Sequence, residues 1–175
     1  MLSVNYYRGH WKAEVLFNNS SKEISMLIDT GAAYTVVQWM TLIMRYPKLS
    51  RKRDEIKQQK PITLNIADGS KIKLYLVEIP NVKIGDLSIS KMKVATSPTY
   101  LNLTNVIGMD FISSFSEIHA KQYGTLELID FKQSSLALNQ SGRDFVSYSS
   151  IVMSESNDIS MMYNAAMMGN KIDNL

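Results

Sequence analysis

The sequence predicts an all-β fold, a small closed or nearly closed barrel that carries one or two short helices. Three observations lead to this prediction: apolar and polar residues alternate in many short runs, turn-forming residues separate the runs, and few segments have helical periodicity. Many short strands with little helix are typical of small barrels. The chain of 175 residues has 45% hydrophobic and 20% charged residues, which suits one domain with a sizeable core.

The first predicted element is a hairpin made by residues 11–17 and 23–28. Apolar and polar residues alternate in the first run, and a cluster of Asn and Ser at 18–21 supplies the turn between the two runs. Residues 35–37 are β-branched and predict a short third strand.

The next elements are a helix and a second hairpin. Residues 38–46 predict a helix that ends before Pro47, because proline lacks a backbone donor and restricts the residue before it. Residues 62–66 and 72–76 alternate cleanly on either side of an Asp-Gly pair at 68–69, which is a strong hairpin signal.

The remaining elements continue this pattern of short strands. A Gly-Asp pair at 85–86 marks another turn. Strands are predicted at 82–84, 87–89, 92–94, 125–129 and 135–138, and a short helix at 111–115.

The most informative segment is 26–32, where an apolar run expected to form a buried strand leads into Asp-Thr-Gly-Ala at 29–32. This arrangement places one carboxylate in a tight turn that water can reach. The triplet alone is short, and its plain interpretation is a turn in which Asp29 bonds to nearby backbone. Two later segments strengthen a functional interpretation: a candidate hairpin tip at 67–70, and a second apolar run into glycine at 105–110.

These three segments, in this order, resemble the retropepsin-like aspartic proteases over most of residues 10–140. In that family the Asp-Thr-Gly turn carries the catalytic aspartate, a flexible hairpin called the flap follows, and an apolar-apolar-Gly segment braces the turn. Gly-Met-Asp-Phe-Ile at 108–112 is similar to the Gly-Met-Asp-Phe-Leu form of bacterial and eukaryotic, rather than viral, members. The resemblance implies roles for Asp29 (catalytic), for Thr30, Gly31 and Ala32 (catalytic loop), for Ala67, Asp68, Gly69 and Ser70 (flap and substrate binding), and for Val106, Ile107 and Gly108 (brace).

The chemistry of such a protease needs two carboxylates. An ionised carboxylate takes a proton from water while a protonated one polarises the scissile carbonyl, and the two share a proton because groups about 3 Å apart cannot both ionise readily. This chain has one Asp-Thr-Gly. We therefore predict a symmetric homodimer in which two Asp29 side chains meet at the two-fold axis, forming an aspartic endopeptidase that cleaves protein or peptide substrates. The alternative is a catalytically silent peptide-binding module with the same fold.

Four residues have further predicted roles, each with a plainer alternative or a departure from the family. The resemblance implies that the Thr30 hydroxyl bonds across the dimer, although it could serve only its own loop. Gly31 would permit unusual backbone torsions and close substrate approach, and Gly69 is either a flap hinge or an ordinary hairpin glycine. Ala33 stands where many relatives carry Ser or Asp, so a hydrogen bond that anchors substrate backbone is expected to be missing.

Asp110 is the rival for a second catalytic acid within one chain. It stands at the expected start of a helix, where a carboxylate can cap backbone N–H groups, and we favour this structural role over catalysis. His10 and His119 lie in no recognisable nucleophile or metal pattern and are interpreted as ordinary residues.

Other classes of function fit the sequence poorly. The chain has no Cys and only two His, so we expect no metal site and no cofactor. No apolar run reaches the ~18 residues of a membrane span and no secretory signal is recognisable, so we expect a cytoplasmic protein. A basic stretch at 45–60 is interrupted by acidic residues and has little aromatic content, so we do not expect nucleic-acid binding and interpret the stretch as a solvated insertion.

A boundary is expected near residue 140, with a protease domain at 1–140 and a tail at 141–175. The tail is rich in Ser and Asn and contains five of the eleven Met residues. We expect it to be disordered or to form a short helix, with Met side chains available for packing on the body or on a partner.

Overall fold

The computed structural model describes residues 1–65, 68–99, 102–120, 124–141 and 152–153. Ala67 of the predicted hairpin tip and most of the predicted tail at 141–175 therefore lie outside the described residues. The strands are β1 (Leu2–Tyr7), β2 (His10–Phe17), β3 (Ile24–Ile28), β4 (Ile62–Asn65), β5 (Lys71–Ile84), β6 (Leu87–Thr96), β7 (Val106–Ile107), β8 (Phe115–Ala120), β9 (Thr125–Phe131) and β10 (Val152–Met153). The helices are α1 (Trp39–Arg45), a 3-10 helix η1 (Pro47–Lys52), α2 (Arg53–Lys57), α3 (Met109–Ile112) and α4 (Gln133–Asn139).

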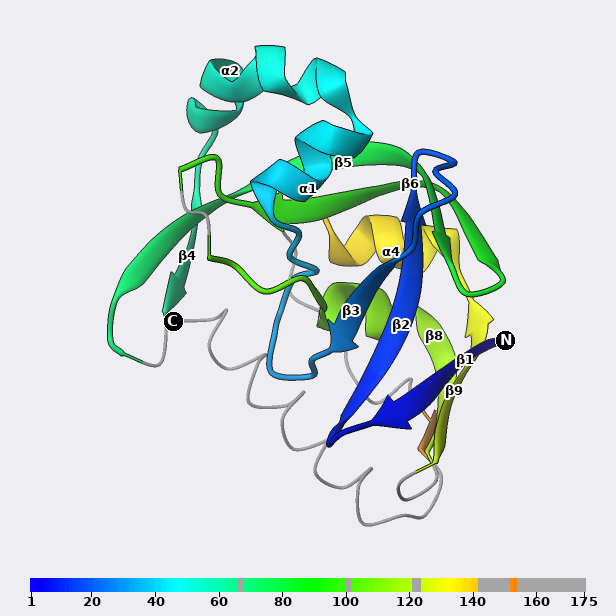
Figure 1. Ribbon diagram of the computed structural model, residues 1–175. Helices are drawn as coiled ribbons and strands as arrows, with labels where there is room; N and C mark the ends of the chain where they lie inside the picture. Colours follow the sequence, from blue (N-terminus) through cyan, green and yellow to red (C-terminus); the bar gives the residue numbers. More distant parts are fainter. Residues whose placement is uncertain (66–67, 100–101, 121–123, 142–151, 154–175) are drawn as a thin grey trace.

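The strands form a strongly bent sheet in which β2 and β3 run side by side (Figure 1), and β7 is the last strand of the order, paired with β3. Neighbouring strands follow the order β10-β8-β9-β1-β2-β3-β7, and β5 also pairs with β2, β4 and β6. The β3–β7 and β8–β10 pairs are parallel, and the others are antiparallel. The pairings of the described strands do not close into a ring. Of the two predicted forms, closed and nearly closed, the structure is compatible with the nearly closed barrel.

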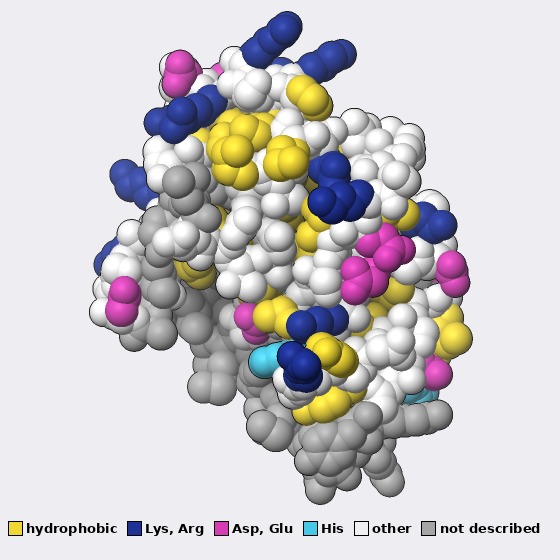
Figure 2. Space-filling view, in the orientation of Figure 1, with side chains coloured by type: hydrophobic (Ala, Val, Ile, Leu, Met, Phe, Trp, Pro, Cys, Tyr) yellow, Lys and Arg dark blue, Asp and Glu magenta, His cyan; other side chains and the backbone are white. Residues whose placement is uncertain are grey.

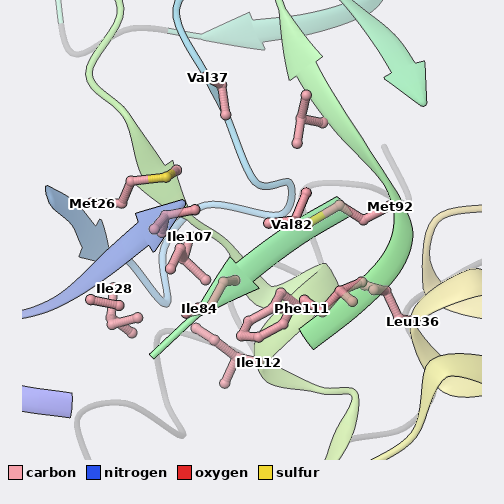
Figure 3. Close-up of a cluster of buried hydrophobic side chains, with 14 of the residues drawn as sticks. Met26, Ile28, Val37, Val82, Ile84, Met92, Ile107, Phe111, Ile112 and Leu136 are labelled. Atoms are coloured by element: carbon pink, nitrogen blue, oxygen red, sulfur yellow. The ribbon is translucent and has the colours of Figure 1, made fainter. Parts of the chain in front are cut away.

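The core lies where the brace segment and α3 meet the inner face of the strands. Figure 3 shows Ile107 and Phe111 packed among side chains from β3, β5, β6 and α4. Phe17, Phe111 and Ile107 are almost completely buried. Burying each such side chain contributes about 1.5–3 kcal/mol to the stability of the fold. The cluster therefore fixes the position of α3 against the sheet.

Most predicted elements are confirmed. The hairpin of β2 and β3, the hairpin of β4 and β5, and the strand β9 lie where alternation predicted them. The α1 helix ends at Arg45, as the proline at position 47 predicted, although η1 then begins at Pro47 itself.

Several predicted elements are wrong, and tertiary contacts explain the difference. Residues 135–138, predicted as a strand, belong to α4, whose spacing puts Leu136, Asn139 and Gln140 on one buried helical face. Residues 35–37 form only isolated bridges from Val36 to β6 and β7. The short helix begins at Met109, earlier than predicted, and the strands β1 and β8 were not predicted.

The basic stretch is folded into η1 and α2 at one end of the molecule, where Lys and Arg side chains gather (Figure 2). Buried Ile56 attaches α2 to the body. Tyr46 attaches the preceding turn, since its hydroxyl donates to Pro80 O at 2.8 Å and accepts from Asn18 N at 3.0 Å. Burial raises the pKa of Tyr46 to about 12. In the part of the chain that the structure describes, no helix has the length and apolar character needed to cross a membrane.

Candidate active site

Asp29 stands where β3 ends, and its side chain is exposed. Its backbone N–H donates to Ile107 O at 2.9 Å, which extends the parallel pairing of β3 with β7 by one bond. Its Oδ1 accepts from Gly31 N at 2.8 Å, and its carbonyl accepts from Ala32 N at 3.2 Å. The turn therefore holds an exposed carboxylate by one of its oxygens.

Gly31 leaves room for the Asp29 carboxylate and has an ordinary backbone torsion. Its φ is not in the left-handed region, which corrects the expectation of an unusual torsion. A Cβ atom at this position would lie 3.2 Å from Asp29 Oδ1. A side chain here would press on the carboxylate that the loop presents.

The segment predicted to brace the loop contacts it on both sides. Val106 and Ile107 pair with β3, and Val106 also exchanges two backbone bonds with Val36 at 2.9 Å each. Beyond Gly108, the N–H groups of the next two residues donate to the carbonyls of Ala32 and Ala33, at 2.8 and 3.1 Å. The main chain around Asp29 is thus tied to a single buried segment.

Asp110 is completely buried, and its carboxylate links Thr35, α3 and the end of α4 by hydrogen bonds. Its Oδ1 accepts from Thr35 N at 2.9 Å, Thr35 Oγ1 at 2.8 Å and Phe111 N at 2.8 Å, and its Oδ2 accepts from Gln140 Nε2 at 2.9 Å. Burial raises the pKa of Asp110 to about 6, opposed first by the Gln140 hydrogen bond and then by Thr35 and Phe111. A carboxylate with no exposed surface cannot share a solvent water with Asp29, which supports the structural interpretation of Asp110.

The hairpin for which a flap role was predicted is formed by β4 and β5. The β4–β5 register runs from Ile62 opposite Leu74 to Asn65 opposite Lys71. At the described part of the tip, Gly69 has a φ of 85°, and Asp68 Oδ1 accepts from Ser70 N at 2.8 Å. Hydrogen bonds from Ser70 lower the pKa of Asp68. Gly69 thus takes a conformation that a side chain would strain.

A pocket of about 170 Å³ lies between the loop and this hairpin. One wall is the loop at 31–34 with Val36, and the other is the strand at 62–65 with Leu74. The wall contributed by the hairpin carries Ile62 and Leu64, and the loop wall carries the small side chains Ala32 and Ala33. The pocket is therefore mainly apolar and adjoins the turn that carries Asp29.

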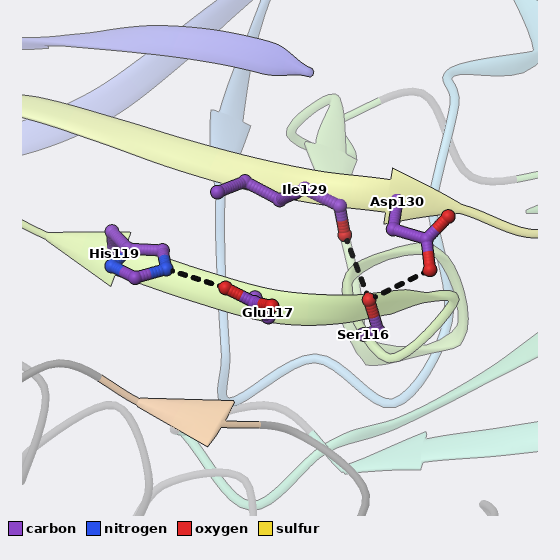
Figure 4. Close-up of polar contacts among 5 residues, drawn as sticks. All are labelled: Ser116, Glu117, His119, Ile129 and Asp130. Carbon is purple, nitrogen blue, oxygen red and sulfur yellow. Dashed lines mark hydrogen bonds and ion pairs between the residues drawn. The ribbon is translucent and has the colours of Figure 1, made fainter.

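A second group of polar residues lies on β8 and β9 and does not form a nucleophile site. Figure 4 shows two separate groups of contacts. His119 Nε2 lies 2.9 Å from Glu117 Oε2, and Ser116 Oγ lies 3.0 Å from Asp130 Oδ2 and 3.4 Å from Ile129 O. The serine hydroxyl is thus bonded to an aspartate and not to the imidazole. Among the residues that the structure describes, no group of three or more His, Cys, Asp or Glu side chains could hold a metal ion.

Sequence reasoning missed three residues of the buried network under the loop: Thr35, Asn139 and Gln140. Each is 2% exposed. Asn139 is the last residue of α4 and Gln140 follows it, and residues 135–138 of this helix were predicted as a strand, so no signal in the sequence joined the two amides to Asp110.

The fold is that of the retropepsin-like aspartic proteases. Residues 13–114 match the family described as gag-polyprotein putative aspartyl protease, and the chain belongs to this family. Among solved structures, it is similar to a retropepsin-like aspartic protease from Rickettsia conorii, with 21% identity and a TM-score of 0.53 over 71% of this chain and 95% of that chain. This likeness supports the fold. No curated protein matches the sequence.

Proposed function

We propose that the chain is an aspartic endopeptidase that becomes active as a homodimer, with one Asp29 from each protomer sharing a catalytic water. The observation that carries this proposal is the exposed Asp29 carboxylate, held by bonds to the backbone of Gly31 and Ile107 beside a mainly apolar pocket of about 170 Å³. One protomer supplies only half of a dyad, because Asp110 is buried and fully bonded. An isologous contact around Asp29 would supply the second half.

In this proposal the ionised Asp29 takes a proton from the water as it attacks the scissile carbonyl. The protonated Asp29 of the partner donates its proton to the carbonyl oxygen, so a neutral tetrahedral intermediate forms. Asp29, which now holds the proton taken from water, protonates the leaving amine as the C–N bond breaks, while the ionised Asp29 of the partner takes a proton from one hydroxyl of the intermediate. A carboxylic acid and an amine are released, and the pair again holds one proton. The joint titration of the pair, rather than either group alone, sets the pH range of the reaction.

The other site residues have supporting roles in the proposal. Thr30 is half-buried, and we assign its hydroxyl to a contact across the dimer. Gly31 and Ala32 keep the loop narrow, and Val106, Ile107 and Gly108 hold it from behind. The hairpin tip, from Ala67 to Ser70, closes over an extended peptide, whose backbone pairs with the hairpin as an added strand.

The direct test is cleavage of an unstructured protein or a mixed peptide library by the purified full chain and by Asp29→Asn. We expect the variant to lose at least about a hundredfold in rate, because its amide cannot act as a base. Asp86→Asn, an equally conservative change at the exposed β5–β6 turn, is the control and retains activity. Peptide binding without cleavage by the wild-type chain would replace this proposal with that of a silent binding module.

A further inference from the structure

Two side-chain amides at the end of α4 occupy the interior directly behind the loop. Asn139 and Gln140, which we call the amide clasp, are both 2% exposed. They contact Asp110 on α3 and Lys93 on β6. Burying two amides costs free energy unless they bond well, so their partners define what the clasp holds.

Gln140 uses all its hydrogen-bonding groups in one orientation. Its Oε1 accepts from Lys93 N at 2.8 Å, and its Nε2 donates to Lys93 O at 2.6 Å. The second Nε2 proton goes to Asp110 Oδ2 at 2.9 Å. A rotated amide would place its oxygen against two acceptors, so Lys93 fixes the amide and the amide fixes the Asp110 carboxylate.

Asp110 passes this constraint to the loop through Thr35. Asp110 Oδ1 accepts from both the backbone N–H and the hydroxyl of Thr35, and the same hydroxyl accepts from Gly108 N at 3.2 Å. Thr35 also accepts from Ala95 N at 2.8 Å through its carbonyl. A continuous set of hydrogen bonds therefore runs from α4 to the residues that flank the Asp29 turn.

Asn139 attaches α4 to α3 and to the residues that follow α3. Its Nδ2 lies 3.0 Å from Asp110 O and 3.0 and 3.3 Å from the hydroxyl oxygens of Ser113 and Ser114. These contacts hold α4 against α3 while Leu136 packs in the core. The clasp thus binds both the backbone and the carboxylate of Asp110.

The carboxylate depends on these donors to remain ionised. Among the described residues, every hydrogen-bond donor to this carboxylate is uncharged: Thr35 from the loop, Phe111 from α3 and Gln140 at the end of α4. The Lys93 backbone on β6 acts on it only through Gln140. Gln140 is the donor to Oδ2, so its removal favours the neutral acid. This effect can be measured apart from overall stability.

We propose that Gln140 is a positioning residue for the protease reaction, holding the Asp29 loop in its working shape through Asp110 and Thr35. The kinetic part of the proposal rests on the proposed function above. The structural part, that Gln140 sets the geometry of the loop, stands without it.

The test compares Gln140→Glu and Gln140→Met with Gln133→Glu in the full chain. Gln133 is the matched control, because it lies on the same helix and donates to Lys91 O on the same strand at 2.9 Å but does not contact Asp110. Gln140→Glu replaces the donor to Oδ2 with a second carboxylate. Gln140→Met removes the donor without adding charge.

The kinetic expectation is a fall in kcat of about tenfold or more at pH 7 for both Gln140 variants, as expected for loss of a hydrogen bond to a charged group, with KM within about twofold. Activity of Gln140→Glu recovers as the pH falls, because the two carboxyls then share a proton. Gln140→Met shows no such recovery, and Gln133→Glu behaves as the wild type. Equal kinetics for the Gln140 and Gln133 variants, or a change in KM alone, overturns the proposal.

Two further measurements decide the structural part even if the chain proves to cleave nothing. Hydrogen exchange should show about tenfold weaker protection of the Thr35 and Met109 amides in Gln140→Met, with Val15 on β2 unchanged. Carbon NMR of the Asp110 carboxyl should show a higher pKa than in the wild type. Unchanged protection and an unchanged Asp110 titration reject the role of Gln140, whereas a wild-type chain without protease activity rejects only the proposed function. A Gln140→Glu variant that does not fold at pH 7 leaves these Gln140→Met results to decide.

Discussion

Gly108 lies so close to Tyr34 that a Cβ atom on the glycine would come within 2.4 Å of the Tyr34 carbonyl carbon and oxygen. The same atom would lie 2.8 Å from Ala32 O. These are backbone atoms of the loop, so neither side can move without displacing the other. The absence of a side chain at Gly108 is what allows the brace to touch the loop that carries Asp29.

Gly108→Ala is therefore expected to destabilise the fold by about 3 kcal/mol or more, because the clash involves backbone on both sides. Urea unfolding followed by circular dichroism measures the effect. Gly9→Ala is the control: Gly9 has a φ of 90° but nothing within 4 Å, so it should lose only about 1 kcal/mol from torsional strain. Similar losses for the two variants would show that the close approach is not the cause.

Asp110 should make stability fall as the pH rises through its titration. Burial raises the pKa of this carboxyl from 3.8 to about 6, so the folded state binds its proton more tightly than the unfolded chain. The stabilisation that the protonated Asp110 gives the folded state is fully present below about pH 4 and is lost as the pH rises past 6. The free energy of unfolding falls by about 3 kcal/mol over this range. Asp110→Asn removes this dependence.

Unfolding in urea at several pH values between 4 and 7 tests the point for Asp110. The informative quantity is the difference in free energy of unfolding between wild type and Asp110→Asn, because other titrating groups cancel in it. That difference should shift in favour of the variant as the pH rises. A difference independent of pH would mean that Asp110 titrates alike in both states.

Tyr46→Phe tests how the turn before η1 is attached. The change removes a donor to Pro80 O and an acceptor for Asn18 N, and should cost about 1–2 kcal/mol. Tyr7→Phe is the control, since that side chain is 53% exposed and should change stability by less than about 0.5 kcal/mol. Thermal unfolding compares the two, and equal midpoints would contradict the role given to the Tyr46 hydroxyl.

The sequence was sufficient for those parts of the fold that depend on neighbours along the chain. Local alternation of apolar and polar residues, together with turn residues, predicts the hairpins β2–β3 and β4–β5 and the apolar run that leads into Asp29. The Asp-Thr-Gly turn and the glycine that follows β7 carried the family resemblance. These features need no knowledge of distant contacts.

The buried network could not be predicted because it joins distant residues. Thr35 and Asp110 are 75 positions apart, and Gln140 is 30 positions beyond Asp110. Residues 135–138 are too few to distinguish a strand from a helix by periodicity, and the burial of Leu136 with the amide clasp selects the helix. The reason for Gly31 was also inaccessible, because it depends on the position of Asp29 Oδ1.

Ala33→Ser should improve substrate binding if the proposed protease function is right. Ala33 lines the pocket beside the loop, where many relatives carry a hydroxyl or carboxylate, and a serine could bond to substrate backbone. One such bond is worth about 0.5–1.5 kcal/mol, so KM for a peptide substrate should fall about two- to tenfold with kcat nearly unchanged. A lower kcat at constant KM would indicate instead that this position disturbs Asp29.

If two Asp29 side chains are required, inactive protomers should inhibit active ones by forming mixed dimers with them. Asp29→Asn should fold and pair normally, because Gly31 N can still donate to a side-chain oxygen at position 29. With wild-type chain held constant and random pairing, an equal amount of the variant should halve the rate, and a ninefold excess should reduce it to about a tenth. The rate per protomer of wild type alone should also rise with its concentration until dimers are saturated. An equal excess of an unrelated protein should have no effect. If the rate stays unchanged when the variant is added at concentrations where sedimentation shows mixed dimers, a single Asp29 is sufficient and the dyad is excluded.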